Sequence, residues 1–385
     1  MNPFSNFTIT QRLLNDIAQI DEFKGRWASI GRLAPERLSS LRRIATIESV
    51  GSSTRIEGSK LTDDEVEALL TGIEIRSFQS RDEQEVAGYA DVMELILESY
   101  SEITLTENHI KQLHGTLLKH SEKDERHRGQ YKKVPNSVEA FDETGQRIGV
   151  IFETATPLET PYRMADLVAW TNAVLKSGEH HSLLVIGYFV IQFLAIHPFQ
   201  DGNGRLSRAL TTLLLLQNGY DYVSYSSMER IIEDRKEEYY IALRRGQATL
   251  GGEESQLNEW ITFFITCLLQ LVDVLDRKVV EEQMMAPLPA LSAQILNIVQ
   301  EHGRVTVREA VALTGANRNT VKSHIQKLVK MGQLATHGRG RGTWYEWSYR
   351  NRDIGQSLAR GDREIQAGDG HSLDDVLKKS DDLLQ

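Results

Sequence analysis

Cysteine is almost absent from this sequence, since Cys267 is the only one among 385 residues. A single thiol cannot form a disulfide within one chain, nor a zinc or iron–sulfur site built from several cysteines. The chain is long enough to bury a large hydrophobic core without such crosslinks. We therefore expect a protein of a reducing compartment that is stabilised by packing.

Long apolar runs and an excess of basic residues are also missing. The longest apolar stretches, 182–196, 209–216 and 261–275, are shorter than the roughly 18 to 20 residues that a membrane-spanning helix needs. The first residues lack the pattern of a signal peptide. The net charge of −10 argues against a surface that binds nucleic acid throughout. These absences predict a cytoplasmic protein without a membrane partner.

Helical spacing dominates the sequence, so the predicted fold class is mainly α. Strand-like runs at 138–141 and 148–152 flank a turn at 142–145 and predict one β-hairpin. Two prolines within 284–290 interrupt a long helical pattern and predict a domain boundary. The predicted divisions are an N-terminal helical region at 1–105, a central domain at 106–283, a C-terminal domain at 284–347 and a polar tail at 348–385.

The strongest functional signal is the segment His197-Pro-Phe-Gln-Asp-Gly-Asn-Gly-Arg-Leu-Ser-Arg208, between two apolar helical stretches. Gly202, Asn203 and Gly204 tolerate left-handed backbone angles, which lets successive N–H groups point into one concavity. The free N–H groups of the helix that follows add to this concavity. The segment therefore predicts a loop that binds an anion.

Charged side chains at both ends of this loop suggest the chemistry. Arg205 and Arg208 are three residues apart, so they share a helix face and can hold a polyphosphate. Asp201 offers an oxygen ligand of the kind that Mg²⁺ prefers. His197 can accept a proton near neutral pH. A base, a carboxylate suited to a metal, a glycine nest and two arginines within twelve residues are hard to explain by structure alone.

This segment resembles, at each defining position, the motif His-x-Phe-x-Asp/Glu-Gly-Asn-Gly-Arg-x-x-Arg of Fic domains, which are mostly AMP transferases. The resemblance implies an all-helical Fic core with a β-hairpin flap, ATP as substrate and Mg²⁺ held by Asp201. It implies that His197 takes a proton from a Ser, Thr or Tyr hydroxyl of a protein substrate, that Asn203 stabilises the transferring group, and that the arginines hold the β- and γ-phosphates. Self-modification and a homodimer are further expectations.

The resemblance assigns two other parts of the site. The protein substrate is expected to add a strand to the hairpin at Asn136, Ser137, Val138 and Glu139. The adenine base is expected beside Tyr239, Tyr240 and Gln247, although tyrosine pairs on helices are often packing residues.

An inhibitory element is predicted before the core. Ser53-Thr-Arg-Ile-Glu57-Gly58 resembles the Ser/Thr-x-x-x-Glu-Gly/Asn motif of Fic inhibitory helices. The resemblance implies that Glu57 pairs with Arg208 and keeps the γ-phosphate from binding there. In some relatives the same glutamate helps to remove AMP, so that reverse activity is an open alternative.

The segment 291–347 resembles a winged helix-turn-helix domain. It holds eight Lys and Arg against three Asp and Glu, so it is locally basic. DNA and protein are both open as its partners. The candidate DNA-binding residues are Asn317, Arg318, Asn319, Lys322, Arg339 and Arg341. A second hypothesis for the whole chain is a transcriptional regulator that senses nucleotide with little catalysis; phosphocholine transfer and phosphorylation also remain open.

Overall fold

The computed structural model describes residues 4, 7–30, 35–71, 78, 80–141, 147–250, 257–285, 289–330, 332–338 and 340–348. The chain forms two compact units, Met1–Val280 and Glu281–Gln385. The predicted boundary after residue 283 lies near this division. The predicted polar tail, apart from Ser348, lies outside the described residues, as does the tip of the predicted hairpin at 142–146.

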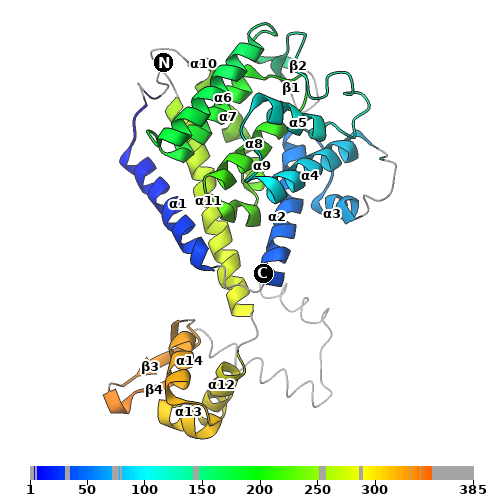
Figure 1. Ribbon diagram of the computed structural model, residues 1–385. Coiled ribbons are helices and arrows are strands. Elements are labelled where there is room, and N and C mark those ends of the chain that lie inside the picture. The colour runs from blue at the N-terminus through cyan, green and yellow to red at the C-terminus, as the bar shows by residue number, and fades with distance from the viewer. Residues whose placement is uncertain are drawn as a thin grey trace, which may run out of the picture. The chain divides into compact units, whose positions relative to one another are not determined.

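The N-terminal unit is a helical assembly with one small hairpin (Figure 1). The hairpin pairs β1 (Ser137–Phe141) with β2 (Arg147–Glu153) in antiparallel register, as the sequence predicts. The helices are α1 (Gln11–Ile30), α2 (Pro35–Ile56), α3 (Asp63–Thr71), α4 (Arg81–Ser99), α5 (Glu107–Leu117), α6 (Thr160–Ser177), α7 (Ser182–Ile196), α8 (Asn203–Gln217), α9 (Met228–Asp234), α10 (Lys236–Ala248) and α11 (Leu257–Met285), with a 3₁₀ turn at Asp221–Tyr225.

Helices α7 and α8 form the centre of this unit. Nearly every residue of both helices is buried. Helix α7 is apolar on almost every side, whereas the first half of α8 also buries polar side chains, among them Arg205 and Arg208. Helix α6 packs on α7, and α4 packs on α8. Complete burial of a large side chain such as Phe189 stabilises the fold by about 1.5 to 3 kcal/mol. The loop between α7 and α8 is therefore fixed at both ends by the core.

Helix α2 brings a distant part of the sequence to this centre. It packs against α4, α8 and α9, and its last turns are buried from Val50 to Ile56 apart from half-buried Arg55. The chain turns at Gly58, which has a φ of 107° that favours glycine. Helix α2 therefore ends two residues before this glycine.

Helix α11 is longer than the apolar stretch noted in the sequence. Among the described helices, its segment Leu257–Val279 has the length and mean hydropathy, 1.4, that a membrane span would have. Trp260, Phe264 and Leu268 are buried in the core of the unit, and the Trp260 indole donates to the Gly187 carbonyl at 2.7 Å. This helix therefore acts as a core helix here.

The C-terminal unit has its own small core. Its elements are α12 (Ala290–His302), α13 (Val307–Thr314), α14 (Arg318–Lys330), β3 (Leu334–His337), a 3₁₀ turn at Gly340–Gly342 and β4 (Trp344–Trp347). Thr306 and Glu309 form a reciprocal capping box at the start of α13. Val321, Ile325 and Leu328 face inward from α14. Three helices followed by an antiparallel β3–β4 wing give the winged helix-turn-helix fold that the sequence predicts.

Candidate active site

The predicted loop begins at His197, which ends α7 in the left-handed conformation with φ 51° and ψ 60°. Among the described residues, it is the only non-glycine with positive φ. Its N–H donates to the Phe193 carbonyl at 2.9 Å. The imidazole is half-buried. A conformation that costs about 1 to 3 kcal/mol persists only where surrounding contacts hold it.

The middle of the loop is held by buried side chains. Phe199 is fully buried and stacks on the His114 ring, with centroids 3.8 Å apart. The Asn203 amide accepts from the Phe199 N–H at 2.9 Å and donates to the Phe199 carbonyl at 2.7 Å. The Asn203 side chain therefore closes the loop in this structure, and its stabilisation of a transferring group stays a prediction. Gly202 follows Asp201 with a φ of 77° and caps α8.

Asp201 lies among arginines. Its carboxylate accepts from Arg81 at 2.7 Å and from Arg205 at 3.2 Å. Burial alone would raise the pKa of Asp201, but the Arg205 charge, the Gly202 N–H and Arg81 together hold it below its usual value. Arg205 also pairs with Glu85 at 3.2 Å, so the structure places Arg205 beside Asp201 rather than free in solvent.

The side chains around Asp201 show whether this part of the site offers the ligands that Mg²⁺ needs. The described residues contain no cluster of three or more His, Cys, Asp or Glu side chains that could hold a metal ion. Asp201 supplies one ionised, partly exposed carboxylate, and Mg²⁺ commonly uses one or two carboxylates together with phosphate oxygens and waters. Asp201 thus fits as one ligand of a magnesium ion whose other ligands would be phosphate oxygens and waters.

Arg208 is held by α2 at the other end of the loop. Its guanidinium donates to the Ser53 hydroxyl at 2.9 Å, to the Ser53 carbonyl at 2.8 Å and to Glu57 Oε1 at 2.8 Å. The Glu57 carboxylate also lies directly against Gly204. If residue 204 had a side chain, its Cβ would be only 2.1 Å from Glu57 Oε1. The predicted inhibitory residues and the predicted phosphate-binding residues therefore meet.

The Glu57–Arg208 pair is ionised at neutral pH. Burial opposes a charge on Glu57, yet the charges of Arg208 and Arg205 hold the pKa of Glu57 below its usual value. Burial likewise disfavours the Arg208 cation, but Glu57 raises the pKa of Arg208 above its ordinary range. Each charge is thus compensated by the other, and removal of one leaves a buried charge without its partner.

The electrostatics of His197 favour a neutral imidazole. Burial lowers the pKa of His197 to about 4, and the nearby Lys132 cation acts in the same direction, while Glu57 and Asp201 partly oppose them. A neutral imidazole can accept a proton, whereas an imidazolium cannot. His197 is therefore in the protonation state that a general base needs at neutral pH.

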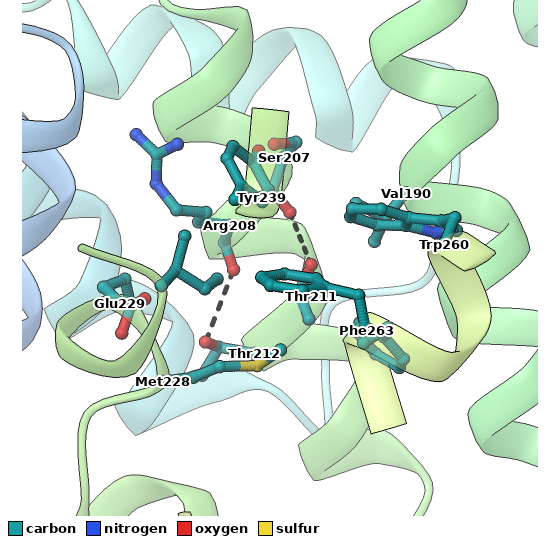
Figure 2. A pocket seen from close by; sticks show the side chains of 12 residues that line it. Val190, Ser207, Arg208, Thr211, Thr212, Met228, Glu229, Tyr239, Trp260 and Phe263 are labelled. Carbon is teal, nitrogen blue, oxygen red and sulfur yellow. Dashed lines mark hydrogen bonds between the residues drawn. The ribbon is translucent and has the colours of Figure 1, made fainter. Parts of the chain in front are cut away.

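The predicted adenine residues lie together on α10. Tyr239 and Gln247 are buried, and the half-buried Tyr240 ring lies 5.2 Å from the Tyr239 ring. The Tyr240 hydroxyl donates to the Ile56 carbonyl of α2 at 3.4 Å. Tyr239 also lines a cavity of about 20 Å³ among aromatic and aliphatic side chains. Figure 2 shows the Arg208 guanidinium pointing away from Trp260 and Phe263 of this cavity, which is too small for a base.

The predicted flap begins beside the loop. Asn136 is the last residue before β1, and its amide donates to the Phe199 carbonyl at 2.8 Å. Ser137, Val138 and Glu139 follow in β1, and their side chains lie outside the described part of the structure. The flap strand therefore starts within hydrogen-bond distance of the loop that carries His197.

The predicted DNA-binding residues lie on the C-terminal unit. Arg318, Asn319 and Lys322 are exposed on α14. Asn317 is exposed as well and caps this helix by accepting from the Asn319 N–H at 2.9 Å. Arg339 lies outside the described residues, and so does the side chain of Arg341.

Sequence reasoning missed Lys132, His114 and Arg81. Lys132 is 3% exposed and His114 is fully buried, and both contact the loop. His114 carries a recognisable signal, since it lies on the apolar side of α5 with Ile110 and Leu117. Lys132 and Arg81 carry no such signal, because lysine and arginine are exposed in most positions.

Comparison with known proteins agrees with this geometry. Residues 104–215 match the Fic/DOC family, and residues 291–334 match the family described as winged helix-turn-helix DNA-binding. The chain therefore contains a Fic domain followed by a winged helix-turn-helix domain. The Fic match includes the loop, the flap and helices α5 to α7, whereas Glu57 and α2 lie outside it.

Named relatives and solved structures extend the comparison. The chain is 27% identical over 195 residues to a probable protein adenylyltransferase of Aquifex aeolicus. This alignment covers 48% of this chain and 53% of the relative. It is 25% identical over 244 residues to a protein adenylyltransferase Fic of Drosophila persimilis, covering 62% and 43%. The chain thus spans about half the length of these relatives.

Two crystal structures have the same fold. A Fic family protein from Desulfovibrio desulfuricans G20 aligns with a TM-score of 0.57 at 22% identity, over 89% of this chain and 98% of the other. A Fic domain containing signaling protein from Bacteroides thetaiotaomicron VPI-5482 aligns with a TM-score of 0.53 at 25% identity, over 68% and 96%.

Proposed function

We propose that this protein transfers AMP from ATP to hydroxyl side chains of proteins, itself included, and that Glu57 holds it in an inhibited state. One observation carries the proposal: a neutral His197 stands at one end of a glycine loop whose other end, at Arg208, is occupied by a carboxylate. The names of the curated relatives support the same reaction.

The proposed reaction assigns a step to each side chain. His197 accepts the proton of a Ser, Thr or Tyr hydroxyl, the oxygen bonds to the α-phosphorus of ATP, and the bond to pyrophosphate breaks. The N–H groups at the start of α8 and the arginines stabilise the phosphate charge. Bound Mg²⁺ would offset further negative charge on the phosphates, and Asp201 is the residue that would hold it.

Inhibition follows from the contacts of Glu57. Its carboxylate uses an Arg208 nitrogen that a γ-phosphate needs, and it lies against Gly204 where phosphate oxygens would approach. Two anions cannot share this site without strong repulsion. Loss of the Glu57 carboxylate should therefore admit ATP in a reactive position. The same carboxylate is also suited to orient a water for removal of AMP.

Radiolabelled ATP tests the reaction directly. The Glu57→Gly protein is incubated with a cell lysate and ATP that carries label at either the α- or the γ-phosphorus. AMP transfer predicts protein-bound label from α-labelled ATP alone, whereas phosphorylation would transfer the γ-label. Absence of both labels on any protein would favour the second hypothesis, a regulator that senses nucleotide without catalysis.

We further propose that the C-terminal unit binds DNA. The exposed Arg318 and Lys322 lie on the helix that enters the major groove in winged helix-turn-helix proteins. A gel-shift assay should show binding that weakens steeply with salt, and Lys322→Ala should lower the slope of log affinity against log salt by about 1. Absence of any shift at low salt would leave a protein partner as the alternative.

A further inference from the structure

The peptide carbonyls around His197 are bound by one short segment of the chain. The Lys132 ammonium donates to the Ile196 carbonyl at 3.0 Å, and the Lys132 backbone N–H donates to the Pro198 carbonyl at 2.9 Å. The Asn136 amide donates to the His197 carbonyl at 3.4 Å and to the Phe199 carbonyl at 2.8 Å. Consecutive carbonyls from residue 196 to residue 199 are thus all occupied.

This arrangement holds a backbone that is strained. His197 has a positive φ, and side chains other than glycine adopt this conformation at a cost of about 1 to 2 kcal/mol. The hydrogen bonds from Lys132 and Asn136 fix the peptide planes on both sides of it. Since the direction of the His197 side chain depends on these planes, Lys132 and Asn136 determine where its imidazole lies.

The same ammonium also holds both ends of the flap. It donates to Asn136 Oδ1 at 2.7 Å, just before β1, and to Thr154 Oγ1 at 2.8 Å, just after β2. The Thr154 hydroxyl in turn donates to the Asn136 carbonyl at 2.8 Å. With its bond to Ile196, the ammonium uses all three of its N–H groups, each on a neutral acceptor.

Burial of the Lys132 ammonium costs free energy, which its hydrogen bonds offset only in part. Its side chain is 3% exposed, and burial lowers the pKa of Lys132 to about 8. An ammonium loses much hydration energy in such a place, and neutral acceptors compensate it less well than a carboxylate at hydrogen-bond distance. A methionine of similar length would avoid this cost but would lose the three ammonium bonds, to Ile196 and to both ends of the flap.

We propose that Lys132 and Asn136 form a clamp that positions His197 relative to the flap, so that a substrate hydroxyl docked on the flap meets the imidazole. This inference rests on the proposed function, which supplies the roles of His197 and of the flap. Lys132 is a positioning residue here, because it acts through Ile196, Asn136 and Thr154. Its cation has a second effect, since it helps to keep His197 neutral, against the opposing charges of Glu57 and Asp201.

The test uses the full chain with Glu57→Gly as background and compares Lys132→Met with Lys133→Met. Lys133 is the exposed neighbour, so both variants lose one positive charge. Lys132→Met should lower the maximal rate of AMP transfer about 100-fold, because a small misplacement of reacting groups has effects of this size. The KM for ATP should change less than threefold, and Lys132→Arg should restore at least a tenth of the rate.

Rates of Lys132→Met and Lys133→Met that agree within threefold would overturn the clamp. If Lys132→Met does not fold, Asn136→Ala replaces it; that variant keeps the charge and should lose about tenfold in rate, and a full rate would likewise overturn the proposal.

A second readout separates failure of the clamp from failure of the proposed function. The His197 imidazole is titrated by NMR in protein labelled with ¹⁵N-histidine, its signal being assigned from His197→Ala. Lys132→Met, or Lys132→Arg if the first is unfolded, should shift the His197 titration or its imidazole signals, whereas Lys133→Met should not. If Glu57→Gly transfers no AMP, the proposed function fails. The clamp is then rejected only if the His197 signal is the same in the Lys132 variant as in the protein with Lys132.

Discussion

The two ends of the loop between α7 and α8 are held in different ways. The His197 end is held by Lys132, Asn136 and His114, which all belong to the segment that matches the Fic family. The Arg208 end is held by Ser53 and Glu57 of the N-terminal region, outside that segment. The first set of contacts is made to peptide groups of the loop, whereas the second occupies the guanidinium that we propose binds the γ-phosphate of ATP.

The contacts at the His197 end position a side chain, whereas the contact at the Arg208 end is the one that we propose inhibits the site. Contacts at the His197 end are made to peptide carbonyls, which no substrate competes for. The contact at the Arg208 end is an ion pair, and a phosphate is a direct competitor for the same guanidinium. Mutations at the first end should therefore reduce activity, while mutations at the second end should increase it.

The largest expected effect is at the His197 end. In the Glu57→Gly background, His197→Ala removes the proposed general base and should lower AMP transfer by about 10² to 10⁴-fold. Binding of ATP, measured by calorimetry, should change little, because the phosphates are held by the rest of the loop. A transfer rate within threefold of the background would show that His197 is not the base.

A smaller effect concerns His114, which supports the same end. Its Nδ1 accepts from the Gly129 N–H at 2.9 Å, so its Nε2–H donates to the Asp201 carbonyl at 3.0 Å and the ring is neutral. Burial lowers the pKa of His114 to about 4 from 6.5. The unfolded chain therefore binds a proton below pH 6.5 that the folded protein excludes, and the free energy of unfolding should fall by about 3 kcal/mol between pH 6.5 and 4 from this group.

Chemical denaturation across this pH range checks the assignment. His114→Gln cannot titrate, so its free energy of unfolding should decline less steeply with acid than that of the wild type. Identical slopes for the two proteins would mean that His114 is not buried as a neutral ring.

The smallest effect is expected for Ser53, one of the two residues of α2 and its end that hold Arg208. Ser53→Ala removes the hydroxyl that accepts from Arg208 and should weaken the hold of α2 by about 1 kcal/mol, which corresponds to roughly a fivefold rise in self-modification. Ser40→Ala, at an exposed serine in an earlier part of the same helix, is the control. A fall in activity for Ser53→Ala would place Ser53 in the catalytic machinery instead.

Much of the architecture is readable from the sequence because its signals are local. The hairpin, the winged helix-turn-helix fold and the helices around the loop follow from spacing, turns and glycines. The meeting of Glu57 with Arg208 was expected only through the family motif, since nothing local links positions 151 residues apart.

Other features depend on packing that no local pattern encodes. The role of Lys132 requires the carbonyl of Ile196, which is 64 residues away, and the Asn203 amide is used within the loop because Phe199 folds back onto it. The Arg81–Asp201 contact joins positions 120 residues apart. Such contacts arise when buried polar groups find partners in the assembled core.

The most direct test of the account is the rate of self-modification of Glu57→Gly compared with the wild type, at saturating ATP and matched protein concentration. Loss of the carboxylate frees Arg208 and the surface over Gly204, so the variant should react at least tenfold faster, since about 1.4 kcal/mol of released binding energy gives this factor. Equal, low rates for both proteins would contradict the claim that Glu57 inhibits the site.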